Sequence, residues 1–342
     1  MEHITSGRVL LLGDGDVSFS RAFVSRLRTN HADRDQPSCS GAIHIVCTVF
    51  HDHDNTLTKH PKASDNLEFL SLQPDVEVRF NVDATQLPTD LCNIDHMIFN
   101  FPHTGGKTNL RLARQLASGV CRSAAERLSP TGRLYLSVTG GQSGLPDDIL
   151  PDSAGWITHE LPVHNKDSWQ LLYLAADWEL TAVTVLPFES KNWNGYVPTG
   201  YRGSHRAFHS KHPVTVIFTK ESQESPLVSP GSATFHQLRP FYEHDMSFWW
   251  RSTSDDLNQD RISRLCRDVI ELSNDGIRSA HHLPSMDYQC PNTHRQSVVL
   301  RVVWQHWPIA LSRDRANQLH TKLRDTIEGK QQSLADWHWI LR

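Results

Sequence analysis

A short alternation of glycine and aspartate, GDGD at residues 13–16, separates an apolar run from a helix-like segment near the start of the chain. Glycine lets a backbone approach a ligand closely, and in doubly wound α/β sheets ligands bind outside the carboxyl ends of the strands. The carboxylates of Asp14 and Asp16 would repel a pyrophosphate, whereas they suit a cationic ligand such as S-adenosylmethionine. On its own the motif is weak, because an ordinary tight turn has the same composition.

A second polar loop, Asn100-Phe101-Pro102-His103, ends another apolar run. The amide of Asn100 can donate and accept hydrogen bonds, Phe101 offers a stacking surface, and Pro102 restricts the loop. His103 has the chemistry to accept a proton, although in a chain with 21 histidines a single one is more often structural. The loop therefore either holds a nucleobase or is a plain turn between a strand and a helix.

Basic residues concentrate in two segments of a chain whose formal net charge is −4. Residues 107–133 hold six Lys and Arg against one acid, and residues 202–220 hold four against none. Such segments fit a polyanion that docks on one face, or they are solvated helix faces. The side chains expected to contact the phosphates of such a polyanion, for example RNA, are Lys107, Arg111, Arg114, Arg202 and Arg206.

Composition excludes several classes of protein. Among the 342 residues, 38% are hydrophobic and 21% charged, and no apolar run approaches the ~20 residues of a membrane span. The start has no signal-peptide core, so we expect a cytoplasmic protein, with the nucleus or nucleolus as the alternative. Six cysteines without a C-x-x-C pair argue against a zinc ribbon and a disulfide framework. No metal site is predicted.

Short apolar runs alternate with helix-like stretches through the first part of the chain. Strands are expected at residues 8–13, 42–50, 76–80, 96–101 and 132–138, and helices at 18–29, 61–70 and 107–128. A further helix and strand follow within 167–188, and a last strand lies at 212–220. This rhythm predicts an α/β fold, a Rossmann-like methyltransferase sheet with helices on both faces, over residues 1–220.

A different pattern begins after a Ser/Pro-rich linker at residues 221–233. Strand, helix, strand, helix and strand patterns follow one another within 234–342, with room for another strand near 280–290. This order predicts a small α+β domain of the ferredoxin-like type.

Three motifs in the first domain resemble the 25S rRNA uridine-N3 methyltransferase family. They are GDGDVSFS from Gly13, NVDATQL at 81–87 and IFNFPHTGGK at 98–107. The resemblance spans about residues 8–220. It implies that S-adenosylmethionine is the cofactor and that an RNA uridine is the substrate, with rRNA as the expected partner and tRNA as the alternative.

The same resemblance implies roles for individual residues. Gly13, Asp14, Gly15 and Asp16 would line the methionine moiety of the cofactor. Asp83, Ala84 and Thr85 would lie beside its adenine, and the segment Asn100 to His103 would hold the extruded base, with His103 placed to accept the N3 proton. The family tends to place a ribose-binding acid after the second strand. His51 stands there in this chain, so Asp52 beside it is the candidate for ribose contact.

The second domain is similar to the ferredoxin-fold anticodon-binding domain that ends phenylalanyl-tRNA synthetase chains. HDMSFW at 244–249 stands where that family has Arg-Asp-Ile/Leu-Ser-Phe. Trp304, Trp307 and Trp337 are candidates for stacking on unpaired bases, with core packing as the alternative. This sequence contains no synthetase catalytic domain, so we expect it not to charge tRNA.

The sequence therefore predicts an S-adenosylmethionine-dependent RNA methyltransferase that acts at uridine N3 of rRNA. The alternatives are a tRNA-directed methyltransferase and a non-catalytic RNA-binding or assembly factor that retained the fold. A dinucleotide-dependent oxidoreductase is opposed by the paired acids of the glycine loop.

Overall fold

The computed structural model describes residues 1, 3–32, 42–105, 109–145, 164–199, 211–220, 237–251, 257–274, 276–306, 309–333 and 337–342. The chain divides into two compact units, Met1–Leu238 and Arg239–Arg342. The predicted linker at 221–233 falls outside the described residues.

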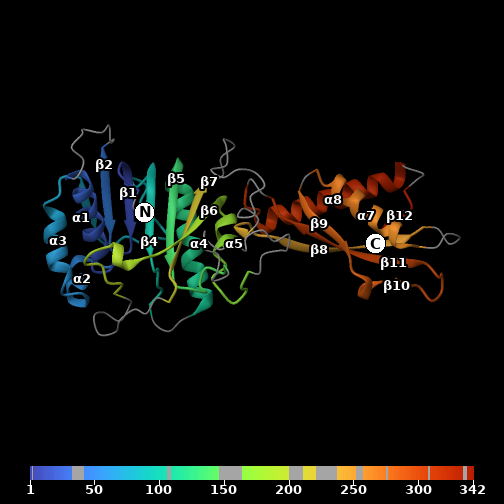
Figure 1. The fold of residues 1–342 in the computed structure, drawn as a ribbon, viewed down its shortest axis with the longest axis horizontal. Coiled ribbons are helices and arrows are strands. Elements are labelled where there is room, and N and C mark those ends of the chain that lie inside the picture. The colour runs from blue at the N-terminus through green and yellow to red at the C-terminus, as the bar shows by residue number, and fades with distance from the viewer. Residues whose placement is uncertain are drawn as a thin grey trace. The chain divides into compact units, whose positions relative to one another are not determined.

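A seven-stranded sheet forms the centre of the first unit (Figure 1). Its strands are β1 (Gly7–Leu12), β2 (Ile43–Thr48), β3 (Val76–Arg79), β4 (Ile94–Asn100), β5 (Leu128–Val138), β6 (Leu180–Pro187) and β7 (Val214–Lys220). The helices are α1 (Ser18–Ala32), α2 (His53–Lys59), α3 (Ala63–Ser71), α4 (Leu110–Arg127) and α5 (Leu171–Ala176), with a 3₁₀ turn at Ser190–Asn192. The strand order is β3-β2-β1-β4-β5-β7-β6, and β7 runs antiparallel to both of its neighbours. The predicted α/β fold is confirmed.

Helices cover both faces of this sheet because its strands are apolar on both sides. Val9 of β1 lies in the core that contains Phe23 of α1. Its neighbour Leu10 lies in the core that contains Val120 of α4. Successive side chains of a strand point to opposite faces, so one apolar run supplies both cores, as parallel sheets require.

The strand order reverses between β1 and β4. From β1 the chain proceeds to β2 and β3 on one side, whereas β4 is followed by β5 on the other side. The loops that leave the carboxyl ends of β1 and β4 therefore diverge, and the crevice between them is where doubly wound sheets bind ligands. The glycine-aspartate loop follows β1, and the Asn100 loop follows β4.

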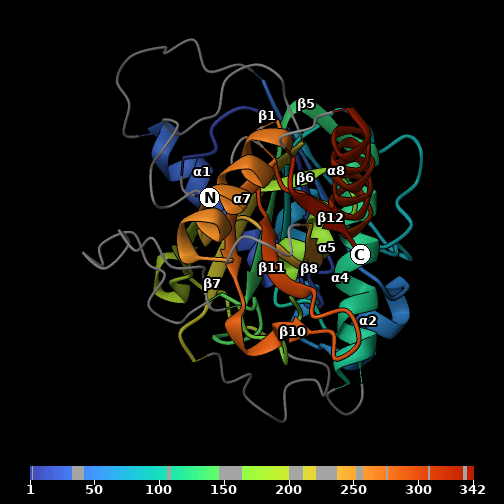
Figure 2. The same ribbon diagram turned by 90° about the vertical axis from the view of Figure 1, so that its right-hand side faces the viewer.

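The second unit is a five-stranded antiparallel sheet with helices (Figure 2). Its elements are β8 (Tyr242–Trp250), α7 (Gln259–Leu272), β9 (Ile277–His282), a 3₁₀ turn (Pro284–Met286), β10 (Tyr288–Gln289), β11 (Gln296–Trp304), α8 (Arg313–Ser333) and β12 (Trp339–Leu341). Four strands follow the order β10-β11-β8-β12, and the fifth, β9, pairs with β11 outside this order. This arrangement confirms the predicted small α+β domain.

Most aromatic residues of the second unit belong to its core. Trp304 is 1% exposed and donates its indole N–H to Nδ1 of His320 at 3.4 Å, and Trp337 is 6% exposed. Neither offers a free face to a base, so the stacking role considered for these two side chains is wrong. Trp307 falls outside the described residues. Tyr288 is instead 46% exposed, and its ring lies 6.0 Å from that of Trp249.

Candidate functional site

Three motif loops converge on one cavity at the carboxyl ends of β1, β3 and β4. The cavity has a volume of about 960 Å³, within the range of small-molecule sites. Its lining includes the predicted residues Gly13, Asp14, Gly15, Asp83, Ala84, Thr85, Asn100, Phe101 and His103. The structure thus brings together side chains that lie up to 90 residues apart in the chain.

The glycine-aspartate loop is held by close packing and by α1. Gly13 has φ +60°, and a Cβ atom there would lie 2.7 Å from the ring of Phe99. The carboxylate of Asp14 accepts hydrogen bonds from the backbone N–H of Ser20 at 2.7 Å and from its hydroxyl at 2.8 Å. Val17 has φ 52°, an uncommon conformation for a β-branched residue. The loop is therefore a fixed and partly strained structure.

Asp14 is a partly buried carboxyl group in the wall of this cavity. Burial, and next the charge of Asp16, raise its pKa from 3.8 to about 7, against the opposing hydrogen bonds from Ser20. Asp16 itself is buried beside the loop, accepts from the backbone N–H of Ser18 at 3.0 Å and is not among the residues that line the cavity. A cation bound near Asp14 would be stabilised by the pair of acids.

The loop after β3 is fastened to α4. The carboxylate of Asp83 accepts from the backbone N–H of Thr85 at 2.8 Å and from its hydroxyl at 2.7 Å. Arg122 donates to the carbonyl of Thr85 at 2.9 Å. A Cβ atom at Gly119 would lie 2.6 Å from that of Thr85, so only glycine permits this approach.

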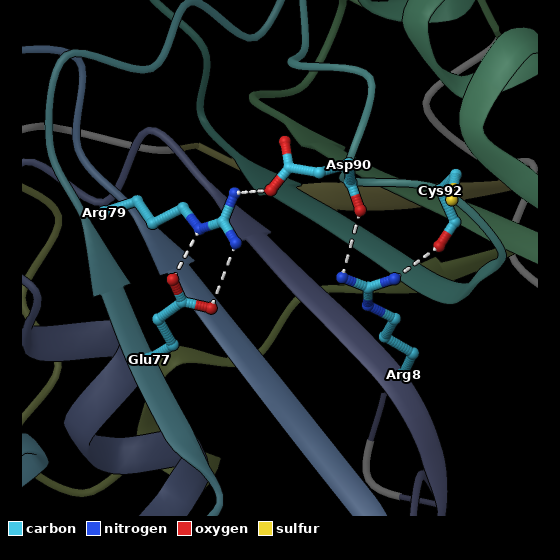
Figure 3. Close-up of polar contacts among 5 residues, drawn as sticks. All are labelled: Arg8, Glu77, Arg79, Asp90 and Cys92. Atoms are coloured by element: carbon cyan, nitrogen blue, oxygen red, sulfur yellow. Dashed lines mark hydrogen bonds and ion pairs between the residues drawn. The ribbon is translucent and has the colours of Figure 1, made fainter.

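The later part of the same connection, at Asp90 and Cys92, is held by two arginines of the sheet strands, as Figure 3 shows. Arg79 contacts Glu77 at 2.7 Å and also pairs with Asp90. Arg8 donates to the carbonyls of Cys92 at 2.8 Å and Asp90 at 3.2 Å. The segment that carries Asp83 is thereby fixed at both ends.

Asp52 is not brought into the cavity, contrary to the ribose contact proposed for it. Its carboxylate caps α2, accepting from the backbone N–H of Asn55 at 2.8 Å and from its amide at 2.6 Å. His51 lines the cavity in its place, and Lys59 approaches Nε2 of His51 at 2.9 Å. An N-cap of this kind satisfies helix N–H groups, which explains why the carboxylate turns away.

Asn100 lines the cavity and carries a buried hydrogen-bond donor. Its Oδ1 accepts from the hydroxyl of Ser137 at 2.7 Å, and that hydroxyl lies 2.9 Å from the hydroxyl of Thr215. Nδ2 of Asn100 is buried and has no hydrogen-bond partner among the described residues. A buried donor left unpaired costs about 1–3 kcal/mol, so its persistence at a cavity wall is the mark of a binding group.

The residues after Asn100 shape the rest of this loop. Phe101 has φ 51° and packs edge-on against Phe188, with ring centroids 5.0 Å apart. Pro102 is buried behind it and does not line the cavity. The strain at Phe101, like that at Val17, is placed in a motif loop rather than in the core.

His103 stands at the exposed side of the same loop. Its Nδ1 accepts from the backbone N–H of Gly105 at 2.7 Å, which puts the proton of the neutral ring on Nε2. Partial burial lowers the pKa of the ring below its usual 6.5. In this geometry His103 presents a donor, and the base role expected for it stays a prediction.

The predicted phosphate contacts divide into two kinds. Arg111 is exposed on α4. Arg114 is held by the protein, because its guanidinium donates to the carbonyl of Ser168 at 2.6 and 2.9 Å and to that of Lys166 at 2.6 Å. Lys107, Arg202 and Arg206 lie outside the described residues.

We expect Arg114→Ala to lower the free energy of unfolding by about 1–3 kcal/mol, because two carbonyls lose a charged donor. Arg111→Ala, the matched control on the same helix, should change it by less than about 0.5 kcal/mol and should lower the salt slope of RNA binding by about one unit. Urea unfolding and salt titrations of RNA binding measure both quantities. Equal stability of the two variants would contradict the anchoring role of Arg114.

Sequence reasoning missed several cavity residues. Tyr196 closes the cavity and packs against Phe19, with ring centroids 5.2 Å apart, and burial raises the pKa of its phenol well above the usual value. His60 and Thr199 line the cavity on either side of Gly15. Tyr196, His60 and Thr199 all lie outside the three motifs that carried the resemblance to the methyltransferase family.

The described residues provide neither a metal site nor a membrane-spanning helix. Among the described residues, no group of three or more His, Cys, Asp and Glu side chains is placed to hold a metal ion. No helix in the described part of the chain is long and apolar enough to cross a membrane.

The fold and the glycine-aspartate loop define a Rossmann-like methyltransferase domain. Residues 10–200 match the BMT5-like family, described as rRNA (uridine-N3-)-methyltransferase BTM5-like, and the chain belongs to this family.

Curated relatives contain the second domain in their names. The chain is 34% identical over 232 residues to the mouse ferredoxin-fold anticodon-binding domain-containing protein 1 homolog, covering 67% of this chain and 33% of that protein. It is 32% identical over 218 residues to the human ferredoxin-fold anticodon-binding domain-containing protein 1, and the match covers 62% of this chain and 31% of that protein. The chain thus spans about a third of the length of these relatives. Both resemblances inferred from the sequence are confirmed.

Among solved structures, the 16S rRNA methyltransferase KamB is similar with a TM-score of 0.37 and 14% identity, over 63% of this chain and 88% of that one.

Proposed function

We propose that the protein is an S-adenosylmethionine-dependent RNA methyltransferase that methylates N3 of an rRNA uridine. The observation that carries the proposal is the buried, unpartnered Nδ2 of Asn100, which lines the same cavity as the glycine-aspartate loop. Family membership supports the reaction class, and the rRNA substrate is that of the family description.

The cavity residues fit the proposed cofactor. S-adenosylmethionine is a sulfonium cation that supplies an electrophilic methyl group. Asp14 offers a partly buried carboxylate to that positive charge, and the backbone around Gly15 leaves room for the methionine moiety. Asp83 and Ala84 line the part of the cavity proposed for the adenine.

The Asn100 loop suits the imide edge of uracil. N3 lies between two carbonyl groups. Its proton would pass to bulk water while His103 carries a proton on Nε2, the N3–methyl bond would form, and the sulfonium would leave as the neutral thioether S-adenosylhomocysteine. Nδ2 of Asn100 and the Nε2–H of His103 are two donors in one cavity wall, and donors aimed at the carbonyls would stabilise the negative charge that spreads onto them. Phe101, packed on Phe188, gives the base an apolar surface.

Nucleoside mass spectrometry tests the proposal. Purified protein is incubated with S-adenosylmethionine and either rRNA or tRNA, and 3-methyluridine is quantified. Methylation of tRNA alone would move the substrate to the alternative suggested by the anticodon-binding name of the relatives. RNA binding without methylation and without cofactor binding would instead favour a non-catalytic assembly factor. We propose the cytoplasm as the protein's site of action, with the nucleus or nucleolus as the alternative.

A further inference from the structure

His60 is a buried histidine that faces the glycine-aspartate loop from the end of α2. Its exposed fraction is 9%, and it lines the cavity. Within the described part of the chain no residue hydrogen-bonds its ring, and the charges acting on it come from Asp16, His51 and Lys59. The ring therefore presents a nitrogen at the cavity wall with which a ligand could form a hydrogen bond.

The space beside Gly15 is flanked by two polar side chains. A Cβ atom built on Gly15 would lie 3.4 Å from Nε2 of His60 and 3.4 Å from the hydroxyl of Thr199. Both atoms can donate a hydrogen bond, and the backbone of Gly15 is not in the left-handed region. The glycine therefore leaves a small gap between two donors.

Acidic and hydrogen-bond-donating side chains both lie near Gly15. Asp14 and Asp16 belong to the loop itself, whereas Lys59 ends α2 and His60 follows it, and the charge of Asp16 acts on the His60 ring. The methionine end of S-adenosylmethionine carries an ammonium and a carboxylate on one carbon. The acids suit the ammonium and sulfonium, which leaves the carboxylate for the donors.

We infer that Nε2–H of His60 and the hydroxyl of Thr199 bind the carboxylate of the methyl donor's methionine moiety, directly beside Gly15. The inference rests on the proposed use of S-adenosylmethionine. It makes His60 a cofactor-positioning residue, because a fixed carboxylate fixes the sulfonium methyl relative to Asn100.

The test compares two ligands that differ only in the carboxylate. Isothermal titration of the whole protein measures the affinities for S-adenosylmethionine and for its decarboxylated form, which keeps the ammonium and the sulfonium. The wild-type protein should prefer the intact cofactor by roughly ten- to a hundredfold, the effect of a charge-assisted contact. His60→Ala should lose most of this preference while its affinity for the decarboxylated form stays within about twofold.

Three further variants separate binding from folding. His60→Gln keeps an N–H donor and should retain part of the preference. Gly15→Ala puts a methyl group between His60 and Thr199 without backbone strain, so it should weaken binding of the intact cofactor more than of the decarboxylated one. His53→Ala, at the exposed start of the same helix and away from the cavity, is the control and should behave as wild type.

The outcomes distinguish this inference from the proposed function. If wild type binds S-adenosylmethionine but does not discriminate, or if His60→Ala weakens both ligands equally, the carboxylate contact is overturned and the methyltransferase proposal stands. If wild type binds neither ligand, both the inference and the proposed cofactor fall.

Discussion

Replacement of Asn100 by alanine should reduce methyl transfer about a hundredfold and leave the affinity for S-adenosylmethionine within about twofold. The amide is fixed through Oδ1, which accepts from the hydroxyl of Ser137 at 2.7 Å, and Nδ2 has no partner among the described residues. A donor that acts on charge developing at the uracil carbonyls contributes mainly in the transition state, and loss of such a group typically costs 10²–10³ in rate. Single-turnover rates with saturating RNA measure the effect.

Asn100→Asp is the matched variant, because it keeps the shape of the side chain and replaces the donor by an acceptor. It should be at least as slow as Asn100→Ala. Ser137→Ala removes only the support behind the amide and should cost less, about tenfold, because the amide can still reach the base. Parental rates in both Asn100 variants would return the loop to a simple turn between β4 and α4.

Sequence reasoning located the three motif loops because parallel strands end at one edge of a sheet. GDGD, VDAT and NFPH each follow an apolar run, so their meeting in space follows from the fold class alone. One cavity is lined by Gly13, Asp83 and Asn100, in agreement with that expectation. The expectation needs only the order of the strands in the chain and their direction, and both can be inferred from a single sequence.

Asp52 and Arg114 show where residue type and position mislead. Asp52 follows the second strand, where a ribose-binding acid is expected, but it also precedes helix α2. Its carboxylate accepts a hydrogen bond from the backbone N–H of Asn55 instead. Arg114 adds to the basic count of α4, yet its guanidinium is committed to Ser168 and Lys166. A charge count records the sign of a side chain and not its partner, and local capping competes with ligand contact.

His60 and Thr199 were invisible to sequence reasoning for a different reason. They approach Gly15 from the end of α2 and from the segment after β6, and no spacing in the chain relates them. Only the crossing of three remote segments makes them neighbours. Tertiary packing, which a single sequence does not display, decides this part of the site.

Replacement of Asp14 by asparagine should stabilise the free protein and abolish the pH dependence of cofactor binding. The pKa of Asp14 is raised from 3.8 to about 7, so the native state binds its proton more tightly than the unfolded chain. Between these two values the free energy of unfolding falls as pH rises, and above pH 7 the penalty reaches its full size, at most about 4 kcal/mol at 1.36 kcal/mol per unit. Asparagine keeps an acceptor for the Ser20 N–H and avoids the partly buried charge.

Cofactor binding should have the opposite preference, because a sulfonium cation favours the ionised form of Asp14. Below its pKa of about 7 the wild-type affinity for S-adenosylmethionine should fall by up to tenfold per pH unit, with uptake of the cation releasing a proton. Asp14→Asn should bind at least tenfold more weakly at pH 8 and show a flat profile, while its melting temperature rises. Titrations from pH 5 to 8 in buffers of different ionisation enthalpy measure the affinity and the released proton together. A wild-type affinity that does not change with pH would show that this carboxylate serves the glycine loop alone, and so would an Asp14→Asn variant that binds as tightly as wild type. A more stable variant with weaker binding would show that the fold keeps a destabilising charge in order to bind a cation.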